Sequence, residues 1–318
     1  MSKTGLVFPG QGSQFAGMGK ELVAAFPEAQ AIYRQADEIL GFPLTRLMLE
    51  GPEEELKQTS VAQPAILTAS MAAWAALGRV WKPDSSLCLA AGHSLGEYSA
   101  LVAAGVMDFA VALKLVRRRG ELMQEAAQAV EGGMAAVIGL TEPEVTSLCL
   151  EADANGQVQP ANFNSPGQVV VSGSKAGLAS LESLAKARKV RVLPLAVSGP
   201  FHSRFMQPAA DRLAPELAKV ELRPARFPVI ANVSAAPVTQ PDEIRAVLLE
   251  QVTGSVRWEE SVRKLTSLGA TRLLEIGPGK VLRGLVKKID PSLAVFGAFA
   301  LEEINQTALE VSRVGASS

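Results

Sequence analysis

The sequence contains few of the residues on which disulfide frameworks, zinc sites and nucleic-acid surfaces depend. Among its 318 residues there are two cysteines, Cys88 and Cys149, each within an apolar run. No disulfide framework or metal site is therefore expected. The 31 basic and 32 acidic residues give a net charge of −1, whereas a dedicated nucleic-acid-binding protein carries a basic excess. The sequence also has only two histidines, which limits the candidates for a general base.

No targeting or membrane-spanning segment is expected either. The first residues, MSKTGLVFPGQG, contain neither the apolar stretch nor the small-residue cleavage site of a secretory signal. The most apolar stretch, 87–113, is interrupted by Gly92, His93, Glu97 and Asp108, and so predicts a buried strand and helix rather than a membrane span. We expect a cytoplasmic protein that contacts no membrane, and a monomer, because no interface stripe stands out.

What the sequence does contain is a regular alternation of short apolar runs and helical stretches. This alternation predicts an α/β fold with a mainly parallel sheet covered by helices on both faces. Within it, residues 127–197 follow the order β–α–β–β–α–β of a ferredoxin-like unit. We therefore predict a large α/β subdomain of residues 1–126 and 198–318, with a small subdomain of residues 127–197 inserted. The expected strands are 5–8, 87–92, 134–140, 168–173, 191–197, 227–232 and 272–277.

Two glycine-rich segments resemble nucleotide-binding motifs but do not match them. Gly10 and Gly12 begin a G-x-G-x-x-G pattern, yet Phe15 stands where the third glycine belongs. Neither Gly19-Lys20 nor the GPGK segment at 277–280 has the spacing of a phosphate-binding loop. NAD and ATP binding are therefore not expected.

The segment 92–96, Gly-His-Ser-Leu-Gly, matches the G-x-S-x-G pattern of a nucleophilic serine. An apolar strand is predicted directly before it and a helix directly after it, which is the context that this turn requires. The glycines permit the sharp turn, and Ser94 then lies at a helix N-terminus, where free N–H groups stabilise negative charge. A glycine-rich turn with a capping serine would use the same residues, but this order of elements favours a nucleophile.

A serine hydroxyl needs a base to become nucleophilic at neutral pH. His93 is adjacent to Ser94, so its side chain is expected to point away from the serine. The other histidine, His202, lies in a loop after a predicted strand, where catalytic side chains are common. By elimination we predict that His202 is the base.

A third catalytic member is not evident, because the acids from Glu97 to Glu182 all lie in helical or turn patterns. In a hydrolase triad the acid follows a strand between the serine and the histidine. We therefore predict a Ser–His dyad, with a backbone carbonyl or a side-chain amide orienting the imidazole.

Three consecutive arginines, 117–119, project in three directions from the predicted helix after the serine turn. A solvated surface is the better interpretation for Arg117 and Arg118. For Arg119 these residues alone leave both possibilities open. A guanidinium beside the nucleophile would suit a substrate with a free carboxylate, since it can bind both oxygens.

Taken together, six features resemble the malonyl-CoA:acyl carrier protein transacylases of fatty acid synthesis and the acyltransferase domains of polyketide synthases. The resemblance covers nearly the whole chain. Its marks are FPGQGSQ (8–14), GHSLGEYSAL (92–101), Arg119, NFNSPGQVVVSG (162–173), GPFHS (199–203) and EIGPGKVL (275–282). The fold that this family implies is a hydrolase-like α/β domain with a ferredoxin-like insert.

The resemblance also implies a role for individual residues. Ser94 would carry the malonyl group, with His202 as its general base and acid. The backbone N–H groups of Gln11 and Leu95 would form the oxyanion hole, and Arg119 would pair with the malonyl carboxylate.

Two further roles rest on the same resemblance. The carbonyl of Gln251 would orient His202. Phe201 corresponds to the malonyl-selective form, since methylmalonyl-selective relatives usually carry serine there.

The implied reaction is a ping-pong transfer of malonyl from malonyl-CoA to the phosphopantetheine thiol of acyl carrier protein, supplying the extender unit for fatty acid synthesis. No cofactor or metal is implied, because the phosphopantetheine belongs to the partner protein. The carrier protein is acidic in this family, so a basic docking surface is expected. The candidates are Arg188, Lys189, Arg191, Arg283, Lys287 and Lys288.

Two other functions remain open on the residues alone. A serine esterase or thioesterase would use the same turn and transfer the acyl group to water, although the missing acid and the presence of Arg119 disfavour it. A non-catalytic carrier-protein or acyl-CoA binding module would keep the fold without the chemistry. The sequence does not separate a fatty acid carrier from a polyketide carrier, or show how strictly malonyl is preferred.

Overall fold

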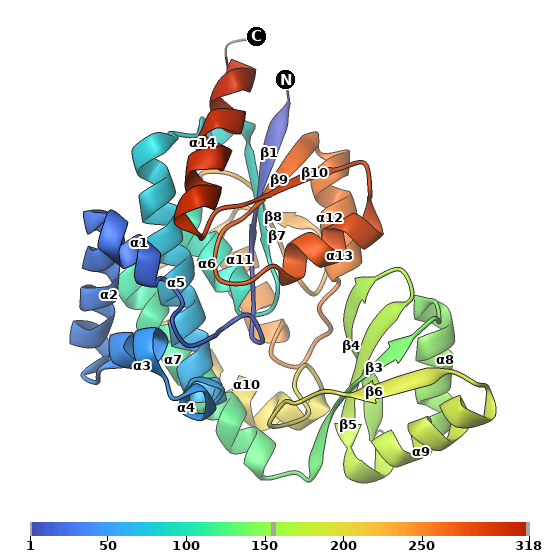
Figure 1. Ribbon diagram of the computed structural model, residues 1–318. Helices are drawn as coiled ribbons and strands as arrows, with labels where there is room; N and C mark the ends of the chain where they lie inside the picture. The colour runs from blue at the N-terminus through green and yellow to red at the C-terminus, as the bar shows by residue number, and fades with distance from the viewer. Residues whose placement is uncertain (1, 154–156, 316–318) are drawn as a thin grey trace.

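The computed structural model describes residues 2–153 and 157–315 of the chain, and within them the larger of two sheets has six strands (Figure 1). Its strand order is β10-β9-β1-β2-β7-β8, and all neighbours are parallel except β7 and β8. The strands are β1 (Lys3–Phe8), β2 (Cys88–Gly92), β7 (Val229–Ile230), β8 (Pro237–Val238), β9 (Ala270–Glu275) and β10 (Ala294–Gly297). This mainly parallel sheet confirms the predicted fold class.

Helices cover both faces of this sheet, which explains why its strands are almost continuously apolar. Along β1, Leu6 and Phe8 face one hydrophobic cluster, together with helices α5, α6 and α7, whereas Val7 faces the other, together with α12 and α13. The alternation follows from the two-residue period of a strand. These helices are α5 (Thr59–Val80), α6 (Gly96–Ala103), α7 (Phe109–Gln128), α12 (Trp258–Ser267) and α13 (Val281–Ile289).

The remaining helices of the large subdomain lie around this centre. Residues 20–40 form two helices, because Pro27 lacks an N–H group and occupies the first turn of the second one. The others are α1 (Lys20–Ala25), α2 (Pro27–Leu40), α3 (Leu44–Glu50), α4 (Glu53–Leu56), η1 (Ser85–Leu87), η2 (Arg204–Met206), α10 (Gln207–Ala218), α11 (Pro241–Glu250) and α14 (Leu301–Gly315).

Among the described residues, α5 alone is long and apolar enough to cross a membrane. However, 83% of its most apolar window is buried inside the protein. It packs against α2, α6 and α7, so it is the central helix of the core.

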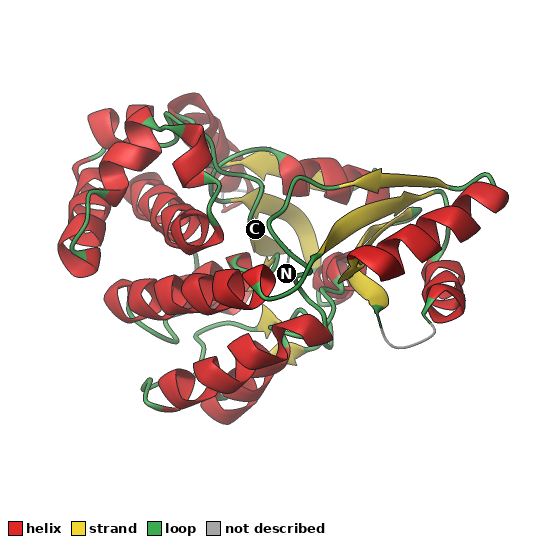
Figure 2. Cartoon of the chain, turned by 90° about the horizontal axis from the view of Figure 1, so that it is seen from below, coloured by secondary structure: helices red, strands yellow, loops and turns green. Residues whose placement is uncertain are grey.

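The smaller sheet has four antiparallel strands in the order β4-β5-β3-β6, and it extends from one side of the molecule (Figure 2). Along the chain the order is β–α–β–β–α–β, as predicted for a ferredoxin-like unit. Its elements are β3 (Gly132–Ile138), α8 (Glu142–Ala152), β4 (Val158–Ser165), β5 (Gln168–Ser174), α9 (Lys175–Ala187) and β6 (Arg191–Pro194).

The two faces of the small sheet have different neighbours. Ala135 and Val137 of β3 pack into a separate core with α8 and α9, whereas Met134 and Ala136 join the main core of the large subdomain. Of the two predicted boundaries, the one at residues 126 and 127 falls inside the last turn of α7, and the one at 197 and 198 falls in the loop after β6.

Candidate active site

The turn between β2 and α6 places Ser94 at the carboxyl edge of the large sheet, in a strained backbone conformation with φ 51°. Both flanking glycines are required by close packing. A Cβ at Gly92 would lie 1.9 Å from the backbone of Gly96, and a Cβ at Gly96 would lie 2.0 Å from the carbonyl oxygen of Phe8. The G-x-S-x-G segment therefore forms the predicted sharp turn, pressed against the end of β1.

His202 lies directly beside this serine. Ser94 Oγ is 2.7 Å from His202 Nε2, and on the other side of the ring Nδ1 is 3.0 Å from the Gln251 carbonyl and 3.2 Å from the Gly254 carbonyl. Because a carbonyl oxygen can only accept, Nδ1 carries the proton, and Nε2 is free to accept the proton of Ser94. Burial, aided by Arg119 and His93, lowers the pKa of His202 to about 3, so the ring is neutral. The geometry is that of a Ser–His dyad oriented by backbone carbonyls.

The second histidine has a different environment. His93 Nε2 is 2.9 Å from Asn164 Oδ1 of β4, and its ring packs against Trp258 with centroids 5.7 Å apart. Its side chain thus bonds to the small subdomain instead of Ser94, as its position next to the serine predicted.

The two predicted oxyanion-hole residues come from separate loops that meet here. Leu95 precedes α6, and Gln11 follows β1 and lines the same cavity as Ser94. Their backbone N–H groups have no hydrogen-bond partner in the part of the chain that the structure describes. The loop comes so close that a Cβ at Gly10 would lie 2.3 Å from the His93 carbonyl oxygen. Two free N–H donors beside the serine can stabilise an oxyanion.

Arg119, which the sequence left undecided, projects from α7 into the site and is only 1% exposed. Its Nη2 donates to Ser94 Oγ at 3.2 Å and to Gln251 Oε1 at 2.8 Å, and its Nη1 donates to Gln63 Oε1 at 2.7 Å. Its guanidinium also stacks over the Tyr98 ring at 5.5 Å. The neighbouring Arg117 and Arg118 instead pair with Glu121.

The charge of Arg119 has no carboxylate in contact with it among residues 2–153 and 157–315. All three acceptors of its hydrogen bonds are uncharged, and its Nε has no partner there. A buried cation is costly unless it is compensated. The site therefore suits an anionic group that enters next to Ser94.

Two residues that the sequence did not single out, Asn232 and Glu97, hold the backbone around Ser94 in place. Asn232 follows β7; its Oδ1 accepts from the Ser94 N–H at 2.7 Å and its Nδ2 donates to the Gly92 carbonyl at 2.6 Å. Glu97, in the first turn of α6, accepts through Oε2 from Gln251 Nε2 at 2.6 Å and from the Asn232 N–H at 3.2 Å. Burial raises the pKa of Glu97 to about 7, although these two donors and Arg119 oppose the shift.

A signal for each was present in the sequence. Asn232 ends an apolar run at the edge of the sheet, and Glu97 is an acid within an otherwise apolar helix. Gln63 of α5, which also contacts Arg119, gave no comparable signal.

The cavity around these groups has a volume of about 250 Å³ and lies between the two sheets. Its lining combines apolar side chains with polar ones, which include Lys57 and Asn162 as well as Ser94, His202 and Arg119. Phe201 is 5% exposed and forms part of the wall. The apolar wall includes Met123, Met134, Val170, Val281, Leu282 and Leu285.

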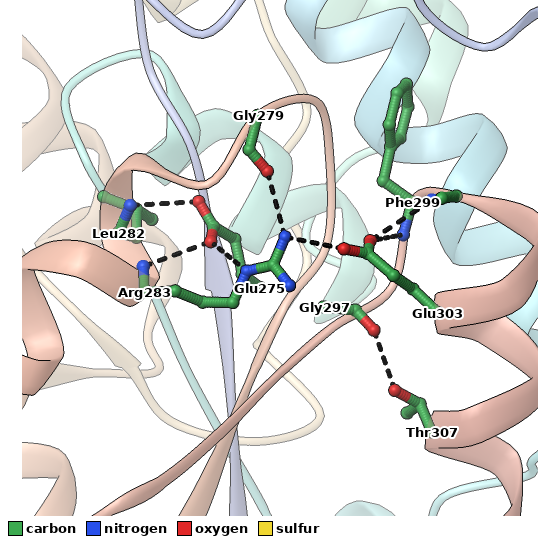
Figure 3. A network of polar contacts seen from close by, with 9 residues as sticks. Glu275, Gly279, Leu282, Arg283, Gly297, Phe299, Glu303 and Thr307 are labelled. Carbon is green, nitrogen blue, oxygen red and sulfur yellow. Dashed lines mark hydrogen bonds and ion pairs between the residues drawn. The ribbon is translucent and has the colours of Figure 1, made fainter.

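The EIGPGKVL motif shapes one side of this cavity through a network of polar contacts (Figure 3). Buried Glu275, at the end of β9, accepts from the N–H groups of Leu282 and Arg283 at 3.0 and 3.1 Å. The Arg283 side chain donates to Glu275 at 3.0 Å and to Glu303 of α14 at 2.8 Å. The network holds the start of α13 against the sheet, which places Leu282 and Leu285 in the wall.

This network corrects one expectation about docking. Arg283 is 18% exposed and pairs with two carboxylates, so its charge is used inside the protein and is not available to a partner. Lys287 and Lys288, in the last turn of the same helix, are exposed. On the small subdomain, Arg188 pairs with Glu151.

Comparison with known proteins gives consistent matches over most of the chain. The family model described as an acyl transferase domain matches residues 6–292. The chain is 48% identical over 295 residues to a malonyl CoA-acyl carrier protein transacylase of Bacillus subtilis, covering 92% of each. Its identity to the Escherichia coli K12 protein of the same name is 46% over 306 residues, covering 95% of this chain and 97% of that one.

The structure is also similar to one chain of a solved complex of a type II polyketide synthase acyl carrier protein with its malonyl-transacylase. The TM-score is 0.91 at 45% identity, covering 97% of this chain and 99% of that chain.

Proposed function

The chain belongs to the acyl transferase domain family, and from that premise we propose that it transfers malonyl from malonyl-CoA to the phosphopantetheine thiol of acyl carrier protein. The observation that carries this proposal is the position of Arg119. Its buried guanidinium lies 3.2 Å from Ser94 Oγ, and Ser94 in turn lies 2.7 Å from His202. A nucleophile beside a buried cation that contacts no carboxylate of the described residues matches an acyl group that ends in a carboxylate.

In the first half-reaction Ser94 Oγ attacks the thioester carbonyl carbon while His202 Nε2 takes the hydroxyl proton. The resulting oxyanion accepts hydrogen bonds from the N–H groups of Gln11 and Leu95. The carbon–sulfur bond then breaks, and His202 returns the proton to the sulfur of the departing coenzyme A. The malonyl group remains as an ester of Ser94, with its carboxylate on Arg119.

The second half-reaction reverses these steps with a different thiol. His202 takes the proton of the phosphopantetheine thiol, and the sulfur attacks the ester carbonyl. The bond to Ser94 Oγ breaks and the proton returns to that oxygen, which restores the enzyme. Since acyl transfer between oxygen and sulfur changes no oxidation state, the proposed reaction requires no redox cofactor. The neutral state of His202 suits both proton transfers.

Two positions refine the proposal. Gln251 orients His202 through its carbonyl and Arg119 through its side chain, so it links the base to the carboxylate site. Phe201 limits the space for a substituent on the malonyl carbon, which favours malonyl over methylmalonyl groups; its burial in the cavity wall supports this role.

We assign residues 1–126 and 198–318 to the catalytic subdomain and residues 127–197 to the small one. The cavity between the two sheets supports this division, because the small sheet covers the reacting groups and limits access of water to the ester. We also place the activity in the cytoplasm.

The test is the intact mass of the purified protein after incubation with malonyl-CoA and no acceptor. We expect one malonyl adduct on the wild-type chain, little adduct with acetyl-CoA, and none on Ser94→Ala. The adduct should then disappear when holo acyl carrier protein is added and reappear on that protein. Steady release of free malonate without transfer would instead show a hydrolase, and no adduct or malonate would show a binding module.

A further inference from the structure

The side chain of Gln251 lies between the buried Arg119 and the buried Glu97. Its Oε1 accepts from Arg119 Nη2 at 2.8 Å, and its Nε2 donates to Glu97 Oε2 at 2.6 Å and to the Ser94 carbonyl at 2.9 Å. Both polar atoms of this amide are therefore hydrogen-bonded, and all three partners lie in or next to the site.

An amide can occupy such a place in two orientations that exchange its oxygen and nitrogen. The reversed orientation would set the NH2 group of Gln251 against the donors of Arg119, and its oxygen against the carboxyl oxygen of Glu97. Both contacts would lose a hydrogen bond inside the protein, where a buried unsatisfied group is costly. Glu97 and Arg119 together thus select one orientation of Gln251.

We propose that Glu97 is a positioning residue for recognition of the malonyl carboxylate: it holds the Gln251 amide so that the amide oxygen fixes Arg119 beside Ser94. The inference rests on the proposed function, since it assigns to Arg119 the acyl carboxylate. Glu97 acts through Gln251 and has no contact with the reacting atoms.

The indirect connection matters for the binding of an anion. A carboxylate in direct contact with Arg119 would use the donors of the guanidinium and compete with the substrate. With the Gln251 amide between them, Glu97 orients the arginine and leaves the guanidinium bonded only to uncharged oxygens. The Asn232 N–H, 3.2 Å from Glu97 Oε2, keeps the carboxyl group itself in place.

Two variants separate hydrogen-bond geometry from charge. Glu97→Gln removes the charge but keeps a carbonyl oxygen at the same reach, and the Asn232 N–H favours turning that oxygen toward Gln251. Glu97→Asp keeps a carboxyl group but withdraws it by one methylene from Gln251. Ser99→Ala is a matched control, because Ser99 is a fully buried residue of the same helix whose hydroxyl has no partner within the described part of the chain.

The measurement is the rate of acyl-enzyme formation with malonyl-CoA and with acetyl-CoA, followed by quenched-flow intact mass. In Glu97→Asp we expect the malonyl-to-acetyl ratio to fall about 10- to 100-fold, the range for a lost hydrogen bond to a charged group. In Glu97→Gln and Ser99→Ala the ratio should stay within about threefold of wild type. A merely structural role would lower both acylation rates together and leave their ratio unchanged.

A double-mutant cycle gives a second readout. In a Gln251→Leu background, Glu97→Asp should change the ratio little further, because the amide through which Glu97 acts is gone. An unchanged ratio in Glu97→Asp, or full additivity in the cycle, would overturn the proposal. Absence of a malonyl adduct on the wild-type chain would instead overturn the proposed function, so the two failures are distinguishable.

Discussion

Two arginine clusters, one partly and one fully buried, lie on the carboxyl side of the large sheet, and their positive charges are balanced in different ways. Arg283 contacts two carboxylates, those of Glu275 and Glu303, and the Nη2 that donates to Glu303 also donates to the Gly279 carbonyl (Figure 3). Arg119 is more deeply buried, yet its hydrogen-bond acceptors are a hydroxyl and two amide oxygens.

The difference shows which cluster is structural and which is open to a ligand. A cation that is fully paired within the chain ties elements together, here β9, α13 and α14. A buried cation without a contacting anion raises the energy of the empty site, and an anionic substrate relieves that cost when it binds. The pairing of a buried arginine is thus a more useful indicator of its role than its burial.

The largest effect should come from the nucleophile that Arg119 contacts. Ser94→Ala removes the only oxygen that we expect to carry the acyl group, so malonyl loading should fall by about 10³-fold or more. Intact mass after incubation with malonyl-CoA measures this, and circular dichroism checks that the fold is retained. A residual adduct of wild-type size would identify a different nucleophile.

Substitution of Arg119 tests directly whether its cluster binds the substrate carboxylate. Arg119→Ala should lower malonyl loading about 100-fold and acetyl loading far less, because only the malonyl group has a carboxylate to bind. Circular dichroism checks that the fold is retained, because the variant leaves the side-chain oxygens of Gln63 and Gln251 without their donor. An equal decrease in malonyl and acetyl loading would mean that Arg119 has a structural role, like Arg283, and does not bind the substrate carboxylate.

Exchange of Arg283 should give the converse result. Arg283→Ala leaves Glu275 buried without its cation, and we expect the free energy of unfolding to fall by about 3 kcal/mol. Burial already raises the pKa of Glu275 despite its N–H donors and Arg283. Urea unfolding measures the loss, while the malonyl-to-acetyl ratio of the surviving folded protein should equal that of wild type. A changed ratio would assign Arg283 to substrate binding.

The pH dependence of the unfolding free energy tests the environment of Glu97, which is linked to Arg119 through Gln251. Its pKa is raised to about 7 in the folded protein, whereas the unfolded value is 4.5. Between pH 4.5 and about 7, Glu97 is therefore protonated in the folded state and ionised in the unfolded state. Its contribution to stability is complete below pH 4.5 and is lost as the pH rises to about 7. Relative to Glu97→Gln, the wild-type chain should lose up to about 3 kcal/mol of unfolding free energy over that range.

Urea unfolding of both proteins at pH 5 and pH 7.5 gives this difference. Other titrating groups, including His202, are present in both proteins and cancel in the comparison. A constant difference between wild type and Glu97→Gln would contradict the raised pKa.

The smallest effect should come from charges outside both clusters. Lys287→Glu with Lys288→Glu places two acids on the exposed last turn of α13, where an acidic carrier protein would meet repulsion. We expect KM for acyl carrier protein to rise several-fold and KM for malonyl-CoA to stay unchanged. Unchanged carrier kinetics would exclude this surface from docking.

Local patterns made much of the fold and part of the site predictable. The strand–turn–helix at Ser94 depends on neighbouring residues, because Gly92 and Gly96 permit a turn that other residues would block. The ferredoxin-like order of residues 127–197 follows from the alternation of short elements. The scarcity of histidine made His202 the candidate base, and the structure brings its Nε2 to 2.7 Å from Ser94 Oγ.

Other features depended on contacts between distant segments. Whether Arg119 faces solvent or Ser94 is decided by how α7 packs against α5 and α6, and residues alone left that open. Arg283 looked like a free surface charge in the sequence, but the return of α14 places Glu303 on it. Asn232 and Glu97 brace the serine through hydrogen bonds to residues more than one hundred positions apart.

By itself, then, the sequence determined the elements, the serine turn and the candidate dyad, because periodicity, glycine geometry and residue scarcity act locally. The tertiary structure alone decided which charges are paired and which are left open. That outcome depends on the electrostatic environment of each buried group, which exists only after several segments have packed around it.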